Sequence, residues 1–301
     1  MGDLESCLNI PRDIAIKLGR EAMTIARRGN YQAPSGRMVS ITDAVRLAVS
    51  GTQSYPPGTD FRLSDRDPVE SKITVENTTT LEAARLLVGD GGDAVVLNFA
   101  DPTTPGGGFL TGALAQEEYL TRSSALIACL EHNEMYSYHR AVNDALSSDY
   151  VIYSPSVPVF RKNDRSLLEE PYCVGILTSP AVRARRVAHD RRSEIKPAMR
   201  SRIHKVLAGG LAHGHMDIVL GAWGCGAFGH DTKLIARLFG EALHRSFAGR
   251  YRRVIFAVTD WSLEQQFIRP FTQVFDSPPV STLLTDDCSG TGASLGEPYD
   301  K

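Results

Sequence analysis

Hydrophobic residues fall into two kinds of segment along the 301-residue chain, and the two kinds alternate from about residue 70 onward. Continuous apolar runs, of which AVVLNFA at 94–100 is the clearest, predict strands that are buried on both faces. Apolar residues spaced three or four apart predict helices with one buried face. Strands are predicted at 72–77, 94–100, 150–160, 172–180, 216–224 and 252–260, and helices at 79–88, 194–212, 231–243 and after residue 260. This alternation favours an α/β domain with a mostly parallel core.

The pattern is different at the two ends of the chain. Hydrophobic spacing predicts a helix at 10–28 and a short strand at 36–41, while two prolines and a glycine predict a loop at 54–68. The last residues are rich in serine, glycine, threonine and aspartate, a composition typical of disorder. The chain is therefore expected to contain a mainly helical extension packed on the core at 1–70, a domain at 71–280 and a disordered tail at 281–301.

Composition excludes several classes of protein. The net charge is −2, which commits the chain neither to nucleic acid nor to a membrane surface, and no stretch is apolar enough to span a bilayer. Five cysteines without a C-x-x-C spacing argue against a disulfide framework or a zinc site, and favour a reducing, cytoplasmic location. His213 and His215 form a lone H-x-H, which is too few ligands to indicate a metal.

Two glycine-rich loops follow predicted buried strands, at the ends where parallel sheets bind ligands. The first begins TPGGGFLTGALAQEEYL, at 104–120, and the second is GCGAFGH, at 224–230. The second loop reads G-x-G-x-x-G and leads into a helix at Asp231, which makes it a candidate anion site. Asp260 comes too late for the dinucleotide fingerprint, and a plain strand–helix turn is the alternative for one such loop. Two loops together favour a ligand that carries phosphate.

Adjacent glutamates in the first loop are candidates for acid–base chemistry. On a helix, Glu117 and Glu118 would project about 100° apart, so one could aim at a reacting atom while the other holds a nearby hydroxyl. A buried carboxyl has a raised pKa and can act as a general acid. The alternative is that both carboxylates only stabilise the first turn of a helix.

Three glycines followed after seven residues by QEE resemble the signature of the poly(ADP-ribose) glycohydrolases. The segments LNFADPTTPGGGFLTGALAQEEYLTRSSAL, YVIYSPSVPVFR, LTSPA and LGAWGCGAFGH resemble the short bacterial and fungal branch of that family, in its order, over about residues 10–275. The resemblance implies a macrodomain-like, three-layer α/β/α fold with a mixed central sheet. It also implies hydrolysis of ribose–ribose O-glycosidic bonds, mainly from chain ends, with release of ADP-ribose.

The resemblance also assigns roles to residues. Glu118 would be the catalytic acid, Glu117 would bind a ribose hydroxyl, and Gln116 would position their segment. Asn98 would hold the terminal ribose, and the two glycine loops would close over the ribose and the diphosphate. The implied substrate-binding set is Asn98, Gly106, Gly107, Gly108, Gln116, Gly224, Cys225, Gly226, Ala227, Phe228 and Gly229. No metal and no cofactor are implied.

The implied partners are poly(ADP-ribose) and ADP-ribosylated proteins, with no membrane and no direct nucleic-acid binding, for a monomer acting in the response to DNA damage. A non-catalytic reader of ADP-ribose and a mono-ADP-ribosyl-protein hydrolase are the alternatives. Residues 181–205 hold nine Lys/Arg and two acidic residues, which is typical of a solvated helix face, a nucleic-acid patch or a surface that steers the polymer. Cys225, five residues before His230, is a weak candidate for a catalytic thiol.

Overall fold

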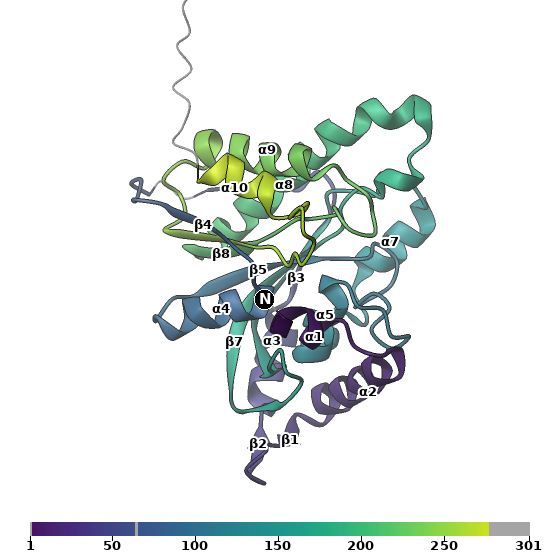
Figure 1. The fold of residues 1–301 in the computed structure, drawn as a ribbon, viewed down its shortest axis with the longest axis vertical. Helices are drawn as coiled ribbons and strands as arrows, with labels where there is room; N and C mark the ends of the chain where they lie inside the picture. Colours follow the sequence, from purple (N-terminus) through teal and green to yellow (C-terminus); the bar gives the residue numbers. More distant parts are fainter. Residues whose placement is uncertain (1, 64–65, 277–301) are drawn as a thin grey trace, which may run out of the picture.

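The computed structural model describes residues 2–63 and 66–276, so the tail predicted at 281–301 lies outside the described residues. The molecule is built on a seven-stranded sheet with the order β3-β6-β7-β5-β8-β9-β4 (Figure 1). The pairs from β7 to β4 are parallel, whereas β6 pairs antiparallel with both of its neighbours. The predicted α/β fold with a mixed sheet is confirmed. The strands are β3 (Gln53–Tyr55), β4 (Lys72–Glu76), β5 (Ala94–Phe99), β6 (Val151–Arg161), β7 (Leu167–Ser179), β8 (Asp217–Leu220) and β9 (Arg253–Ala257).

Helices cover both faces of this sheet because its central strands are apolar on both sides (Figure 1). In β5, Val95 and Leu97 pack in one core cluster with Ile203, while Val96 packs in the other with Leu87. Each such buried side chain contributes roughly 1.5–3 kcal/mol. The first cluster is covered by α8 (Ile195–Ala212), α9 (Thr232–Glu241) and α10 (Arg269–Phe275), and the second by α4 (Thr80–Gly89), α5 (Gln116–Ser123), α6 (Leu126–Leu130) and α7 (Glu134–Val142).

The N-terminal region is built into the sheet as well as packed on it. Residues 54 and 55 were predicted as loop, and this is wrong: β3 pairs with β6, and Pro56 ends the strand without preventing it. The predicted N-terminal helix ends at Gly29, which adopts φ 69°. Its Ala22 packs in a third cluster with Phe109. The elements of this region are α1 (Gly2–Leu8), α2 (Arg12–Arg28), β1 (Asn30–Gln32), β2 (Met38–Ser40) and α3 (Thr42–Gly51).

Polar side chains cap the starts of two helices beside the sheet. The Asp231 side chain accepts a hydrogen bond from the backbone N–H of Lys233 at 3.0 Å, and the Thr79 hydroxyl accepts one from Glu82 N–H at 3.2 Å. These caps fix where α9 and α4 begin, and both beginnings face the same end of the sheet as the two glycine loops. Within residues 2–63 and 66–276, no helix combines the length and apolar character needed to cross a membrane.

Candidate active site

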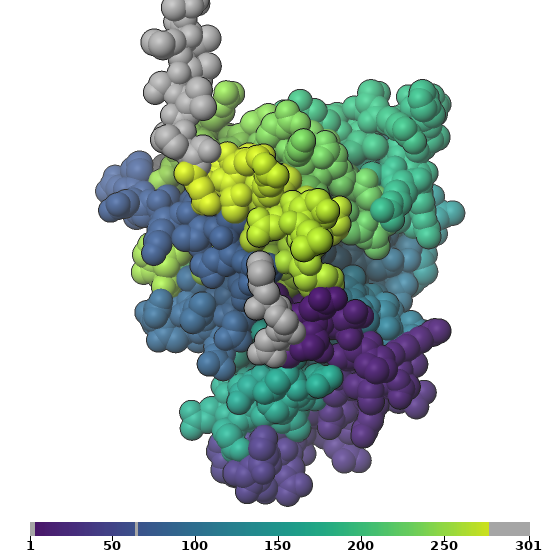
Figure 2. Space-filling view, in the orientation of Figure 1, coloured from purple at the N-terminus to yellow at the C-terminus, as the bar shows by residue number. Residues whose placement is uncertain are grey.

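A cavity of about 780 Å³ opens at the carboxyl ends of β5, β8 and β9. This is the position at which parallel α/β sheets bind ligands. Its wall combines the loop and helix after β5, the loop after β8, the segment after β9 and the start of α4. Leu8 and Asn9 complete the wall, and Figure 2 shows the N-terminal residues (purple) next to the segment after β9 (yellow). Segments from the whole length of the described chain therefore meet at one site.

The first glycine loop holds Glu118 directly. The backbone N–H of Gly108 donates a hydrogen bond to Oε1 of Glu118 at 2.8 Å. Gly107 adopts φ 60°, and a Cβ there would lie 2.3 Å from the same oxygen. Only glycine fits, because any side chain would displace the carboxylate. Gly106 also has a positive φ, of 70°, but lies behind the cavity wall against Thr121.

The two glutamates lie in the first turn of α5, so they are neighbours on a helix, and both line the cavity. Oε2 of Glu117 accepts a hydrogen bond from Asp101 N–H at 2.6 Å. Oε1 of Glu117 and Oε2 of Glu118 are buried without a hydrogen-bond partner among the described residues. Burial raises the pKa of Glu117 well above its usual range, and the charge of Glu118 adds to the shift. Two residues that line the cavity therefore each keep one buried carboxyl oxygen without a hydrogen-bond partner among the described residues.

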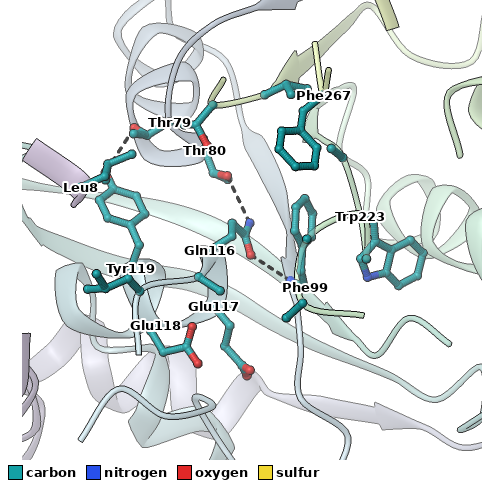
Figure 3. Close-up of a pocket in the computed structure, with 18 of the residues that line it drawn as sticks. Leu8, Thr79, Thr80, Phe99, Gln116, Glu117, Glu118, Tyr119, Trp223 and Phe267 are labelled. Atoms are coloured by element: carbon teal, nitrogen blue, oxygen red, sulfur yellow. Dashed lines mark hydrogen bonds between the residues drawn. The ribbon is translucent and has the colours of Figure 1, made fainter. Parts of the chain in front are cut away.

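Gln116 fixes this turn to the sheet (Figure 3). Its Nε2 donates to Leu97 O at 2.7 Å and to Thr80 Oγ1 at 3.1 Å, and its Oε1 accepts from Phe99 N–H at 2.9 Å. The three bonds join α5, β5 and α4 through one side chain. This is the geometry expected of a residue that positions the two glutamates.

The second glycine loop presents free donors to the cavity. Gly226, Ala227 and Phe228 line the wall, and their backbone N–H groups have no acceptor within the described part of the chain. Successive free N–H groups before a helix form an anion-binding concavity. The loop is shaped by Gly224 (φ 76°) and Gly229 (φ 78°). The loop that was predicted to bind an anion therefore lines the same cavity as the carboxyl pair.

Some predicted residues do not reach the cavity wall. Asn98 is fully buried, with its Nδ2 donating to Thr178 Oγ1 at 3.3 Å; it lies near Glu117, whose pKa it lowers. The Cys225 thiol is buried, and burial raises its pKa to about 12. Nε2 of His230 lies 2.7 Å from Val182 O, so no base serves the thiol. A catalytic role for Cys225 is excluded by this geometry, and its small side chain fills the turn.

Sequence reasoning missed the apolar part of the cavity. Phe99 and Phe267 line it, and in Figure 3 their rings lie on the side of Gln116 away from the glutamates. Asp260 shapes the segment that carries Phe267, because its Oδ2 accepts from Phe267 N–H at 2.6 Å and from Ile268 N–H at 3.1 Å. The only signal in the sequence is an aspartate directly after a strand. These rings offer a surface on which an aromatic base could stack.

Both histidines of the H-x-H pair make contacts with tyrosine side chains. Nε2 of His213 lies 2.8 Å from the Tyr55 hydroxyl, and Nε2 of His215 lies 2.8 Å from the Tyr153 hydroxyl. The His213 ring also stacks on Tyr153, with centroids 3.6 Å apart, and burial lowers the pKa of His213 to about 4. Among the described residues, no group of three or more His, Cys, Asp or Glu could hold a metal ion.

A buried carboxyl pair beside a loop with free backbone N–H groups suits a hydrolase that acts on a phosphate-bearing glycoside. The family model for the catalytic domain of microbial-type poly(ADP-ribose) glycohydrolase matches residues 19–162. The structure of a poly(ADP-ribose) glycohydrolase from Thermomonospora curvata is 44% identical, covers 88% of this chain and 100% of its own, and superposes with a TM-score of 0.83. The enzyme from Deinococcus radiodurans in complex with ADP-ribose is 32% identical, covers 79% and 99%, and has a TM-score of 0.72. No curated protein matches.

The T. curvata enzyme bound to the inhibitor ADP-HPD is also similar, at 44% identity over 87% of this chain and 99% of that one, with a TM-score of 0.81. The chain belongs to the poly(ADP-ribose) glycohydrolase family. It is an enzyme of the microbial type of that family, as the signature in its sequence predicted.

Proposed function

We propose that this protein hydrolyses the ribose–ribose O-glycosidic bonds of poly(ADP-ribose), mainly at chain ends, and releases ADP-ribose. One observation carries the proposal: a single cavity contains three free backbone N–H groups, at 226–228, and two buried carboxyl oxygens without partners. The first set suits a diphosphate and the second suits a glycosidic bond. Relatives that bind ADP-ribose and ADP-HPD support the same reading.

The substrate fits the cavity in one direction. The diphosphate lies on the N–H groups of 226–228, next to the N-terminus of α9. The terminal ribose then lies between Gly107 and the glutamates, and the adenine lies toward the rings of Phe99 and Phe267. The scissile bond is thereby brought to Oε2 of Glu118, the oxygen that has no other partner.

Glu118 protonates the glycosidic oxygen as the C1–O bond breaks, so that the leaving ribose departs as an alcohol. The nearby diphosphate stabilises the oxocarbenium-like cation. A water molecule then adds to C1 and gives its proton to the Glu118 carboxylate, which restores the acid. Burial raises the pKa of the neighbouring Glu117 well above its usual range, so a proton is held directly beside the Glu118 carboxyl. Glu117 holds a ribose hydroxyl.

The test measures free ADP-ribose released from poly(ADP-ribose) by the purified protein, beside Glu118→Gln and Glu117→Gln. We expect Glu118→Gln to lose roughly 10²–10⁴-fold in kcat, the contribution of a general acid. Near-full turnover by Glu118→Gln with none by Glu117→Gln would reverse the two roles. Binding of ADP-ribose without release by the native protein would identify a reader, and release only from mono-ADP-ribosylated protein would identify the other alternative.

The wider setting follows from the same proposal. The protein acts as a monomer in the cytoplasm on polymer attached to proteins, in the response to DNA damage, and without direct nucleic-acid binding. Buried thiols at Cys129 and Cys225 suit a reducing compartment. Sedimentation at working concentration, and polymer levels after DNA damage in cells that lack the protein, test these points.

A further inference from the structure

Most of the charge in the basic segment, 181–205, is used within the protein. Five of its nine cationic side chains form hydrogen bonds or ion pairs with residues outside the segment. Asp144, Asp149 and Glu241 neutralise part of the charge, and backbone carbonyls take up more. These contacts are Arg183 to Asp144 O, Arg191 to Asp144, Arg200 to Glu241, Arg202 to Leu146 O and Ser148 O, and Lys205 to Asp149.

Three arginines remain exposed and form no ion pair within the described residues: Arg185, Arg186 and Arg192. We call them the exposed arginine patch. Lys196 is excluded because it lies near Glu241, whose pKa it lowers. Asp190 is the one exposed acidic residue of the segment outside the Arg191–Glu194 pair. The patch is therefore a local excess of positive charge on a chain whose net charge is −2.

The exposed arginine patch begins at the anion-binding loop of the cavity. The backbone N–H of Arg185 donates to Phe228 O at 3.0 Å, and its Nη1 lies 3.5 Å from Ala227 O. Its side chain covers Gly229, where a Cβ would lie 2.4 Å from Arg185 Cγ. Ala181, just before the patch, lines the cavity itself. The positive charge of Arg185 therefore lies directly beside the loop that would hold the first diphosphate.

The backbone that carries the patch is held firmly. Arg191 places Nη1 and Nη2 at 3.1 and 3.2 Å from the two carboxylate oxygens of Asp144, and its Nε at 2.8 Å from Glu194. Arg191 lies in the 3-10 helix His189–Glu194 and Asp144 follows α7, so the contact ties the segment to the body of the molecule (Figure 1). The backbone next to Arg192 is consequently anchored to the body of the molecule.

We propose that Arg185, Arg186 and Arg192 bind diphosphates of the polymer units beyond the unit in the cavity. This inference rests on the proposed function. Every unit of poly(ADP-ribose) carries a diphosphate, and the guanidinium fork matches phosphate oxygens. Such contacts are exposed and individually weak, but together they raise the capture rate of a polyanion and fade with salt. The patch therefore selects long polymer over short oligomers, and does not take part in bond cleavage.

The test compares the double variant R186Q/R192Q with R20Q/R28Q, which removes two exposed, unpaired arginines from α2. Arg185 is left intact because it touches the cavity loop. Release of ADP-ribose is measured on a two-unit oligomer and on long polymer, at low and high salt. We expect kcat/KM of R186Q/R192Q on long polymer to fall about tenfold at low salt, with a shallower salt dependence and a much smaller loss on the two-unit oligomer, which has a single diphosphate outside the cavity. R20Q/R28Q should match the native protein on both substrates.

Equal kinetics of R186Q/R192Q and the native protein on long polymer would overturn the inference. The inference would also be overturned if R186Q/R192Q lost binding to RNA or duplex DNA while its kinetics on the polymer were unchanged. The patch would then be a nucleic-acid-binding surface. If the native protein cleaves neither substrate, the proposed function fails instead. In that case, binding of labelled long polymer, measured by fluorescence anisotropy, tests the inference separately. R186Q/R192Q must then bind the polymer more weakly than R20Q/R28Q does.

Discussion

The backbone N–H of Gly108 donates a hydrogen bond to Oε1 of Glu118 at 2.8 Å, and Oε2 of the same carboxyl is buried without a hydrogen-bond partner among the described residues. The orientation of the acid is therefore set by main chain and not by another side chain. A main-chain donor has no rotamers, so the carboxylate is held without loss of side-chain entropy in a partner. The loop conformation and the Glu118 carboxyl are consequently one structural unit.

Replacing Gly107 by alanine should abolish most activity while the fold is kept. The new Cβ would lie 2.3 Å from Oε1 of Glu118 and would push the acid out of position. We expect kcat to fall by about 10²-fold or more, with an unchanged circular dichroism spectrum. Gly36→Ala is the matched control, since Gly36 also has a positive φ, of 87°, but has open space around it. Equal activity of the two variants would show that the loop adapts.

Replacing Gln116 by alanine should lower both stability and kcat. The change leaves the N–H of Phe99 and the carbonyl of Leu97 unpaired in a buried place, at a cost of roughly 1–3 kcal/mol each. The first turn of α5 would also lose its tie to Thr80. Denaturant unfolding and turnover measure the two effects. Gln266→Ala, at another point of the cavity wall, should change neither, and a similar loss in both variants would contradict the positioning role.

Replacing Glu117 by glutamine should stabilise the protein more at high pH than at low pH. Burial raises the pKa of Glu117 well above 4.5, so between 4.5 and the native pKa the folded state binds more protons than the unfolded state. Stability is therefore lost as the pH rises through this window, and the neutral amide avoids that loss.

Thermal unfolding at about pH 4 and about pH 8 checks this expectation, because 1 kcal/mol shifts Tm by about 2–4 °C in a domain of this size. The gain in Tm of Glu117→Gln over the native protein should grow with pH. Glu264→Gln, which alters an exposed glutamate, should show no such trend. A gain that is the same at both pH values would mean that burial of the carboxyl is not what limits stability.

Replacing Asp260 by alanine should raise KM more than it lowers kcat. The side chain accepts hydrogen bonds from the N–H groups of Phe267 and Ile268, so its loss frees the segment that carries the ring of Phe267. That ring is distant in sequence from the glutamates and lines the opposite part of the cavity wall (Figure 3). Steady-state kinetics on a two-unit oligomer separate the two constants. A fall confined to kcat would place the effect at the glutamates instead.

The parts of the site that the sequence predicted are those set by local chemistry. Both glycine loops stand directly after buried strands, and the glutamates stand at a helix start, so short-range pattern was enough to find them. The parts that it did not predict depend on distant contacts. Phe267 reaches the cavity only through the bonds of Asp260, and β3 exists only because β6 lies beside it. Asn98 is buried because of its place in β5. The neighbouring residues of this strand are all apolar, so the sequence shows no alternation that would indicate which way the Asn98 side chain points.

The spacing of hydrophobic residues also failed to predict the short helices. The helix α6 has five residues, too few to show a repeat of 3.6, and α3 leaves Leu47 exposed, which blurs its buried face. The charge of the basic segment also depends on contacts that the local sequence does not reveal. Nine cations against two acids suggested one basic surface, but Asp144, Asp149 and Glu241 arrive from elsewhere in the chain and neutralise part of it.

Leu8 and Phe267 line the same cavity from near opposite ends of the described chain. During synthesis, the helix that carries Leu8 and the loop that carries Glu118 leave the ribosome long before β9 and the segment after it. A growing chain can therefore contain Glu118 while it still lacks Phe267 and the part of the cavity wall that Phe267 forms. The cavity wall is therefore complete only after the segment that carries Phe267 has been made.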